Sequence, residues 1–248
     1  MLAAERQTEI TRLIEARGSV QVEELARELK VSAMTIRRDL LKLEETGRIE
    51  RCHGGAVAKQ EVSYEDKQIR NKWEKNRIAE KCAGLVSSGD TVFLDAGTTT
   101  YEIAKKICNI QGITIVTNDL EIAQIVKQGS AELFVCGGWV QKSTGSMLGY
   151  YATGLLLDFR FDVGFFGGAS INEKLEVMTP TVDKAFLKRE TALRCEKPYL
   201  VVDNSKFDRQ SMVKINGLND YAAVVTDRKF TQEEQEIIRR KKIRIIEI

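Results

Sequence analysis

The sequence predicts a two-domain α/β protein, and two observations lead to this class. The first 58 residues hold three helical patterns and a glycine-containing hairpin, whereas from residue 77 onward short apolar strands alternate with amphipathic helices. A chain of 248 residues is long enough for two domains. We therefore expect a small domain at 1–58, a linker at 59–76 and a larger domain at 77–248.

The composition is that of an ordinary globular protein. Hydrophobic residues make up 43% and charged residues 30% of the chain. No apolar run approaches the roughly 18 residues that span a bilayer, and the first residues lack the apolar core of a secretory signal. We expect a cytoplasmic protein with no membrane partner. The five cysteines form no Cys-x-x-Cys pair and there is one histidine, so we expect no metal site, no disulfide framework and no cofactor.

The N-terminal segment predicts a tri-helical unit followed by a hairpin. The helical patterns cover Ala4–Arg17, Val22–Leu29 and Ser32–Glu44. In the third helix Ile36, Leu40 and Leu43 recur at helical spacing after Ser32, a favourable N-cap residue. Residues 48–57 indicate two short strands around Gly54-Gly55, because glycine accepts the positive φ angles of a tight hairpin. These elements in under 60 residues predict a winged helix-turn-helix.

This unit is the candidate DNA-binding surface. The net charge is only +2, so binding must come from a local arrangement of charge. A helix-turn-helix places residues near the N-terminus of its second helix against base edges, and a wing reaches the backbone or minor groove. The candidates on the third helix are Ser32, Ala33, Thr35, Arg37 and Arg38, and those on the hairpin are Arg48, Arg51, His53 and Gly54. Arginine suits guanine edges or phosphates.

The alternative for an isolated Arg-Arg pair is a solvated helix face. Here the pair lies on the third helix of a compact unit and is followed by a glycine-containing hairpin, which favours DNA binding. His53 fits a wing contact or a turn residue better than a metal ligand, since no partner ligand lies near it in the sequence.

The second segment predicts a mostly parallel, Rossmann-like sheet covered by helices on both faces. The strands we expect are Val92–Leu94, Ile113–Val116, Leu133–Cys136, Val163–Phe166, Leu200–Val202, Ala223–Val225 and Ile243–Ile246. The helices between them are Tyr101–Ile107, Leu120–Lys127, Asp183–Cys195 and Gln232–Lys241. Ligands of such sheets bind at the carboxyl ends of the strands.

The segment Asp95-Ala-Gly-Thr-Thr-Thr100 follows the first of these strands and opens a helix. Small residues let several backbone N–H groups approach one anion, and the helix N-terminus favours negative charge. The segment lacks the Gly-Lys-Ser/Thr ending of a nucleotide-binding loop, so a phosphomonoester on a small molecule fits better than a nucleotide. A threonine-rich N-cap without any ligand is the alternative.

Other strand ends carry residues that are suited to ligand binding. Each is explained singly by a tight turn or a helix cap, but together they would line one edge of a parallel sheet. Lys206 would supply a cation, whereas for Lys188, in mid-helix, ligand contact and a solvated face are equal alternatives. The candidate effector-binding residues are Asp95, Gly97, Thr98, Thr99, Thr100, Asn118, Gly138, Gly168, Lys188 and Lys206.

The sequence from Val31 to Glu44, with "TIRRDL", and the later "HGGA" resemble the DeoR family of bacterial repressors. The second segment resembles the same family in "DAGTTT", "TND" at Thr117–Asp119, Gly137-Gly138, "FDVGFFGGA" and "DNSKF". The resemblance implies that "TIRRDL" lies on the recognition helix and "HGGA" on the wing. It also implies a C-terminal domain related to ribose-5-phosphate isomerase that senses a phosphorylated sugar. A homodimer or homotetramer would then bind double-stranded operator DNA and repress a sugar-metabolism operon.

Two segments depart from the family pattern. The helix at Asp183–Cys195 keeps Lys188 but reads "VDKAFLKRE", where many members carry an acidic residue about three positions before that lysine. Gly145–Asp158 follows no pattern that we can place. Both segments bear on which sugar phosphate is bound.

A sugar-phosphate isomerase-like enzyme with an appended DNA-binding domain is the rival prediction. An isomerase needs a carboxylate that moves a proton between adjacent carbons. The strand end at Phe166–Ser170 supplies no Asp or Glu, and Asp95 and Asp203 are equally explained by capping or by bonding a sugar hydroxyl. We therefore expect a regulator without catalytic residues. A DNA-binding scaffold that has lost its effector is a third alternative, against which the intact Asp95–Thr100 segment argues.

Overall fold

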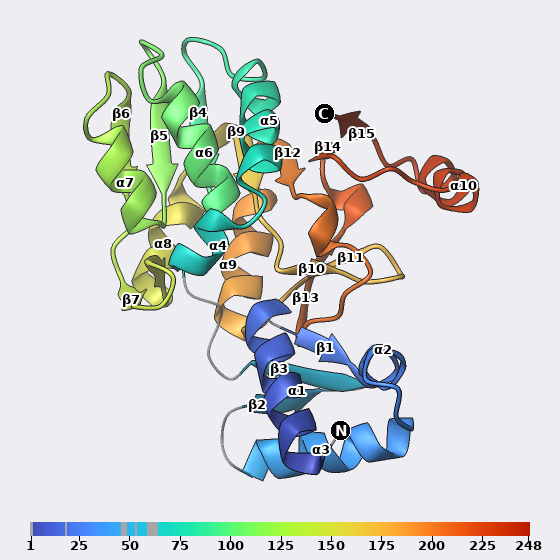
Figure 1. Ribbon diagram of the computed structural model, residues 1–248. Helices are drawn as coiled ribbons and strands as arrows, with labels where there is room; N and C mark the ends of the chain where they lie inside the picture. The colour runs from blue at the N-terminus through green and yellow to red at the C-terminus, as the bar shows by residue number, and fades with distance from the viewer. Residues whose placement is uncertain (1, 18, 46–48, 53, 59–63) are drawn as a thin grey trace.

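The computed structural model describes residues 2–17, 19–45, 49–52, 54–58 and 64–248 (Figure 1). Two of the predicted DNA contacts, Arg48 and His53, lie outside the described residues. The described chain forms an N-terminal helical module, drawn in blue in Figure 1, and an α/β domain built on a central sheet. None of the described helices is long and apolar enough to span a membrane.

The N-terminal module has the predicted winged helix-turn-helix architecture. Its elements are α1 (Ala3–Arg17), β1 (Ser19–Gln21), α2 (Val22–Glu28), α3 (Ala33–Glu45), β2 (Ile49–Cys52) and β3 (Gly55–Ala58). The core of the module contains Ile10 and Ile14 from α1, Leu25 from α2, and Ile36 and Leu40 from α3, all of them nearly inaccessible to solvent. The periodicity of the sequence thus indicated the buried face of each helix correctly.

The wing is a three-stranded antiparallel sheet in the order β1-β3-β2, not a two-stranded hairpin. We did not predict β1, because three residues between two helices give no alternating pattern. Its presence changes the role of Gly55. Only Gly54 has a positive φ, of 81°, whereas a Cβ on Gly55 would lie 2.1 Å from the carbonyl oxygen of Val20 in β1. Gly55 is needed for this close backbone approach.

The α/β domain is built on a seven-stranded sheet in the order β15-β14-β12-β9-β4-β5-β6, with every neighbouring pair parallel. Its strands are β4 (Thr91–Leu94), β5 (Thr114–Thr117), β6 (Glu132–Val135), β9 (Phe161–Phe166), β12 (Cys195–Val201), β14 (Ala223–Thr226) and β15 (Ile245–Glu247). All seven predicted strands are confirmed, although their bounds shift by a few residues.

Helices cover both faces of this sheet (Figure 1). One face packs on α5 (Lys72–Ala83), α6 (Thr98–Ile107) and α7 (Leu120–Val126), and the other on α8 (Tyr150–Asp158), α9 (Val182–Ala192) and α10 (Gln232–Arg240). Within β4 the side chains of Val92 and Leu94 point to the first face and that of Phe93 to the second. Burial on both faces explains why the strands are continuous apolar runs in the sequence.

Several smaller elements surround the carboxyl edge of the sheet. A hairpin pairs β7 (Trp139–Gln141) with β8 (Ser146–Leu148), and a second antiparallel sheet contains β10 (Ser170–Ile171), β11 (Glu176–Thr179) and β13 (Val213–Gly217). The segment that followed no pattern, Gly145–Asp158, thus forms β8 and α8. Within the predicted linker lies a short helix, α4 (Tyr64–Ile69), which the sequence pattern did not indicate. The domain boundaries at 58 and 77 stay predictions.

The strand order changes direction beside β4. The chain runs from β4 through β5 to β6 at one edge, and then returns to β9 on the other side of β4. The connections that follow β4 and β9 therefore leave in opposite directions, which opens a crevice at their carboxyl ends. Asp95 follows β4 and Gly167-Gly168 follows β9, so both segments lie at this crevice.

Candidate functional site

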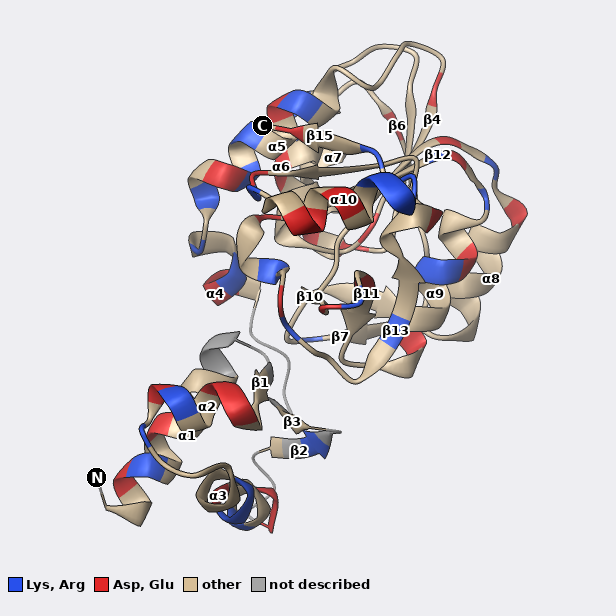
Figure 2. Cartoon of the chain, turned by 90° about the vertical axis from the view of Figure 1, so that its right-hand side faces the viewer, with Lys and Arg blue, Asp and Glu red and all other residues tan. Residues whose placement is uncertain are grey.

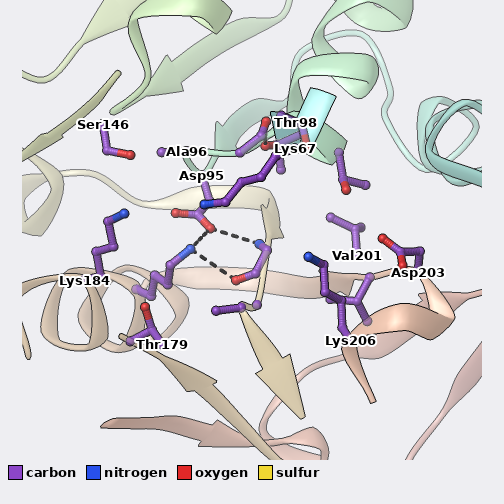
Figure 3. A pocket seen from close by; sticks show the side chains of 18 of the residues that line it. Lys67, Asp95, Ala96, Thr98, Ser146, Thr179, Lys184, Val201, Asp203 and Lys206 are labelled. Atoms are coloured by element: carbon purple, nitrogen blue, oxygen red, sulfur yellow. Dashed lines mark hydrogen bonds and ion pairs between the residues drawn. The ribbon is translucent and has the colours of Figure 1, made fainter. Parts of the chain in front are cut away.

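A pocket lies at the crevice and is lined by the ends of β4, β9 and β12 together with parts of α4, α6 and α9 (Figure 3). Nine of the ten predicted effector-binding residues line it: Asp95, Gly97, Thr98, Thr99, Thr100, Asn118, Gly168, Lys188 and Lys206. The structure does not bring Gly138 to this pocket. A Cβ on Gly138 would lie 2.5 Å from the carbonyl oxygen of Leu148, so packing against β8 explains this glycine.

Asp95 and Lys188 form a buried ion pair in the middle of the pocket. Asp95 Oδ2 accepts a hydrogen bond from Lys188 Nζ and another from the Gly167 N–H at 2.9 Å, and Lys188 Nζ also donates to the Gly167 carbonyl oxygen at 3.1 Å. Lys188 is 7% exposed, so the solvated-face alternative for this residue is wrong. The second carboxylate oxygen of Asp95, Oδ1, is buried and finds no hydrogen-bond partner among the described residues. A ligand hydroxyl would satisfy it.

The N-terminus of α6 supplies hydrogen-bond donors to the pocket. The N–H groups of Ala96 and Gly97 are already bound, to Asn118 Oδ1 at 3.0 Å and Asp119 Oδ2 at 3.1 Å. The first bond to a carbonyl at this end of the helix joins the Tyr101 N–H to the Gly97 oxygen at 2.9 Å. The amides of residues 98–100 thus precede the hydrogen-bonded turn, where the field of the helix favours an anion.

The threonine hydroxyls of this helix differ in their availability. The Thr100 hydroxyl donates to the Gly97 carbonyl oxygen at 2.8 Å and so stabilises the turn. No such bond to a described residue involves the hydroxyls of Thr98 and Thr99, which line the pocket. Two of the three threonines are thus suited to contact a ligand.

The residues that follow β5 support the loop after β4. Asp119 caps α7 by accepting hydrogen bonds from the N–H groups of Glu121 at 2.8 Å and Ile122 at 3.0 Å. Burial raises the pKa of Asp119 to about 6, although these bonds and the one from Gly97 favour the ionised form. Because Asn118 and Asp119 both hold the backbone at Ala96–Gly97, their first role is to fix the shape of the pocket.

A basic cluster stands at the β12 end of the pocket and consists of Lys67, Arg70, Lys75, Lys206 and Arg209. Burial lowers the pKa of Lys206, and the charges of its cationic neighbours lower it further, while nearby Asp203 opposes them. Lys75 Nζ donates to the carbonyl oxygens of Lys67 and, at 2.6 Å, of Arg70. Burial and the charge of Lys206 lower the pKa of Lys75 to about 8.

Asn71 joins α4 and α5 to the end of β12. Its Nδ2 donates to Asp203 Oδ1 at 2.8 Å and to Ser205 Oγ at 3.0 Å. The Ser205 N–H also donates to Asp203 Oδ1, at 2.9 Å. Burial disfavours the ionised Asp203, but Lys206 and these hydrogen bonds outweigh it and lower the pKa of the carboxyl group.

Sequence reasoning missed part of the pocket lining. The unpredicted polar residues are Lys67, Arg70, Asn71, Lys75, Ser146, Thr179, Lys184, Arg209 and Ser211. The charged run at 67–75 has the composition of a solvated linker, and nothing local shows that it folds over the pocket. For Lys184 there was a signal, since it precedes Lys188 by one helical turn and therefore shares its face of α9.

Among the described residues, the predicted DNA contacts lie before and on α3 and on the wing, and Figure 2 shows Lys and Arg positions in blue on α3 and β2. Ser32 Oγ accepts a hydrogen bond from the Thr35 N–H at 3.2 Å, so Ser32 caps the helix as predicted. Arg37, Arg38, Arg51 and Gly54 are exposed, and Arg37 pairs with Glu23 at 3.0 Å. Ala33 instead packs in part against the core of the module.

Two apolar residues on α3 were not predicted as contacts, although Met34 and Leu41 are 58% and 46% exposed. Their exposure on the outer side of the helix suits contacts with thymine methyl groups. The acidic residue within "TIRRDL" has a structural role instead. Asp39 is buried and accepts hydrogen bonds from Arg6 Nε at 2.6 Å and Gln7 Nε2 at 2.9 Å, which fixes α3 on α1.

A winged helix-turn-helix joined to an α/β domain with a polar pocket is the architecture of a ligand-responsive transcriptional regulator. Residues 6–62 match the DeoR-like helix-turn-helix domain, and residues 70–228 match the DeoR C-terminal sensor domain. The chain belongs to the DeoR family and is a DNA-binding transcriptional regulator.

Similar proteins include two curated repressors. The lactose phosphotransferase system repressor of Streptococcus mutans serotype c is 37% identical over 235 residues, which cover 92% of this chain and 93% of that protein. The repressor of the same name from Staphylococcus aureus is 33% identical over 231 residues, covering 90% and 91%. Among solved structures, ribose 5-phosphate isomerase A from Methanocaldococcus jannaschii aligns over 55% of each chain with a TM-score of 0.42 and 15% identity.

Proposed function

We propose that this protein is an operator-binding repressor of a sugar-metabolism operon, and that a phosphorylated sugar in the pocket sets its affinity for DNA. The pocket carries the proposal. It combines the N-terminus of α6 and Lys206, which suit a phosphate, with Asp95 Oδ1, a buried acceptor that lacks a partner among the described residues. The curated relatives are named as repressors of a lactose phosphotransferase system, which agrees with a sugar signal.

The proposed ligand orientation follows from these groups. The phosphate binds at the amides of residues 98–100 and the hydroxyls of Thr98 and Thr99, with Lys206 as its counter-ion. The sugar extends toward Asp95, whose free carboxylate oxygen accepts a hydrogen bond from a sugar hydroxyl. Figure 3 shows Thr98 and Lys206 on one side of Asp95 and the lining residues Thr179 and Lys184 on the other. The pocket therefore extends to both sides of Asp95.

At the DNA, α3 is the proposed recognition helix, with Thr35, Arg37 and Arg38 as the main contacts and Arg51 and Gly54 on the wing. A homodimer or homotetramer presents paired α3 helices to repeated or palindromic half-sites. Ligand binding biases the arrangement of the subunits and so changes operator affinity.

We infer that the pocket binds its sugar without converting it. The end of β9 carries glycines and no carboxylate where an isomerase would need a base. The remaining carboxylates are held by other contacts, Asp95 by Lys188 and Asp203 by Asn71. Incubation with pentose and hexose phosphates should leave them unchanged. Isomerisation that is abolished by Asp95→Asn would show an enzyme instead.

Binding is tested by the thermal stability of the full chain with each phosphorylated sugar and its unphosphorylated counterpart. A phosphorylated sugar should raise the Tm, and Thr99→Val and Lys206→Met should reduce the rise. Lys197→Met removes the same charge from an exposed site outside the pocket and should change nothing. The proposal fails when no phosphorylated sugar raises the Tm, or when the unphosphorylated sugars do so equally.

A further inference from the structure

The turn at residues 203–209, which follows β12, carries Lys206 and has two different sides. The residues of this turn that line the pocket are Asp203, Ser205, Lys206 and Arg209 (Figure 3). Asn204, Phe207 and Asp208 do not line the pocket. Lys206 Nζ donates no hydrogen bond to a described residue, so the conformation of the turn sets where its ammonium lies. The contacts that hold the turn therefore matter for the proposed phosphate site.

Arg228 contacts the other side of this turn. It follows β14 by two residues, does not line the pocket, and its side chain is 13% exposed. Its Nη1 donates to Asp208 Oδ2 at 2.8 Å and to Asn204 Oδ1 at 3.4 Å. Its guanidinium carbon lies 4.7 Å from the centre of the Phe207 ring. One side chain thus contacts residues that precede and follow Lys206 in the sequence.

Arg228 is itself fixed by α10 and by a second aromatic ring. Its Nη2 donates to Glu234 Oε1, and Glu234 Oε2 accepts a hydrogen bond from the Thr231 N–H at 2.7 Å in the N-cap of α10. The Phe230 ring lies 5.6 Å from the guanidinium carbon and packs edge-on against Phe207, with centroids 5.6 Å apart. A planar guanidinium suits this place, because it presents several donors in fixed directions and stacks on rings.

The backbone of the turn depends on contacts from the segment after β14. Asp208 has a φ of 57°, in the left-handed region that L residues rarely adopt, and its ion pair with Arg228 holds it there. Asp227, the neighbour of Arg228, accepts a hydrogen bond from the Asn204 N–H at 2.6 Å. Both ends of the segment that contains Lys206 are therefore held from the side that does not line the pocket.

We propose that Arg228 is a positioning residue for the effector, because it holds the turn at 203–209 so that Lys206 meets the phosphate. The inference rests on the proposed function, which takes Lys206 as the counter-ion of the phosphate. Arg228 acts through its shape more than its charge, since Asp208 and Glu234 both pair with it. The contribution of Lys206 to binding then depends on Arg228, although Arg228 does not line the pocket.

Calorimetry on the full chain tests this with ribose 5-phosphate, glucose 6-phosphate, galactose 6-phosphate, fructose 6-phosphate and fructose 1-phosphate. The compound that binds the wild type most tightly is the probe for the variants. Lys206→Met should weaken its binding at least about tenfold, as expected for a lost charge-assisted hydrogen bond. Arg228→Lys should weaken binding by a similar factor, because an ammonium keeps the charge but cannot make the contacts of a planar guanidinium.

A double-mutant cycle separates positioning from a general loss of stability. In the Arg228→Lys background, Lys206→Met should change the affinity by less than about twofold, because Lys206 is then no longer in place. Arg194→Lys is the matched control. Arg194 donates to the carbonyl oxygens of Leu157 at 3.1 Å and Glu190 at 2.7 Å, outside the pocket. This control should lower the Tm and keep the wild-type affinity for the probe.

Asp208→Asn tests the same contact from the turn. Asparagine tolerates a positive φ, but the ion pair with Arg228 is lost. Positioning predicts several-fold weaker binding, whereas removal of a negative charge by itself predicts tighter binding of an anion.

Three results overturn this inference while the proposed function stands. They are wild-type affinity in Arg228→Lys, losses in Arg228→Lys and Lys206→Met that multiply in the double variant, and tighter binding in Asp208→Asn. An equal loss of affinity in Arg194→Lys overturns it as well, because any weakened arginine contact would then have the same effect. Binding of none of the five monophosphates defeats the proposed function, and this inference with it.

Discussion

Asp95 and Lys188 depend on each other because both charges are buried between the end of β4 and the middle of α9. Lys188→Met leaves the Asp95 carboxylate in the interior without its counter-ion. We expect this variant to lose about 3–5 kcal/mol of unfolding free energy, as for other broken buried pairs. The double variant Asp95→Asn/Lys188→Met removes both charges and should lose much less than the sum of the two single variants.

Urea unfolding of the wild type, of Asp95→Asn, of Lys188→Met and of the double variant at neutral pH measures this coupling. Two additive losses would mean that the two charges do not depend on each other.

The local sequence around Lys188 cannot decide whether this lysine is buried or exposed. Lys188 follows a helical pattern that fits a solvated face equally well, and only the packing of α9 against the rest of the domain buries it.

The roles of two glycines also could not be predicted from the local sequence. Gly138 was predicted as a ligand contact because it follows a strand, but its surroundings in space are those of a packing contact with Leu148. Gly55 was predicted, together with Gly54, as a turn residue of the hairpin. Its lack of a side chain instead lets the backbone of β1 lie close to β3. In both cases the partner lies elsewhere in the chain, and the sequence of the turn contains no sign of it.

At the scale of elements, contacts with the α/β domain hold α4 at the pocket. The Tyr64 N–H donates to the Ser143 carbonyl oxygen at 2.9 Å, and the Tyr64 ring packs edge-on against Tyr101 of α6 with centroids 6.1 Å apart. Asn71 then joins the end of this segment to Asp203 and Ser205. These contacts place Lys67 and Arg70 at the pocket, although they belong to a segment that looked like a linker.

Loss of the Asn71 side chain should therefore weaken ligand binding. Asn71→Ala removes both hydrogen bonds and also places alanine at a φ of 50°, which costs about 1–2 kcal/mol of stability. Asn71→Gly removes the same bonds without the backbone cost. Both variants should bind a phosphorylated sugar several-fold more weakly, and alanine should lower the Tm of the free protein more than glycine does. Wild-type affinity in both variants would show that α4 does not need this connection.

Substitutions on the exposed face of α3 should affect DNA binding and not ligand binding. Arg37→Ala and Arg38→Ala should each weaken operator binding and reduce the slope of log K against log salt by about 1 where the arginine contacts a phosphate. Arg12→Ala, on the exposed side of α1, is the control with the same change of charge. The operator can be selected from random DNA with the protein itself, and binding followed by fluorescence anisotropy.

Unchanged operator affinity in both α3 variants would contradict the assignment of α3 as the recognition helix.

The helices were predictable because an amphipathic helix repeats its pattern over several turns, and the strands of the central sheet because burial on both faces makes them continuous apolar runs. Neither signal marks β1 or α4, since their conformation depends on β3 and on the pocket.

At the scale of the whole molecule, the sequence predicts the parallel sheet but not the order of its strands. Alternating strands and helices indicate a parallel sheet, because a parallel connection needs a crossover. The strand order, with β9 beside β4, is not contained in any local pattern, and yet it creates the crevice. Side chains from Lys67 to Ser211 then meet in one pocket. The loop Asp95–Thr100 was found because its own residues carry the signal, whereas the basic cluster arises from the fold.

In the proposed mechanism, a ligand in this pocket controls binding to DNA. Anisotropy of the selected operator should be measured with the full chain, with and without a saturating concentration of the phosphorylated sugar that raises its Tm. Coupling of the usual size predicts a change in operator affinity of about 5–150-fold in the wild type. At the same sugar concentration, the Thr99→Val/Lys206→Met variant should show a much smaller change. Operator affinity that stays the same while calorimetry shows the wild-type pocket to be filled would contradict the account.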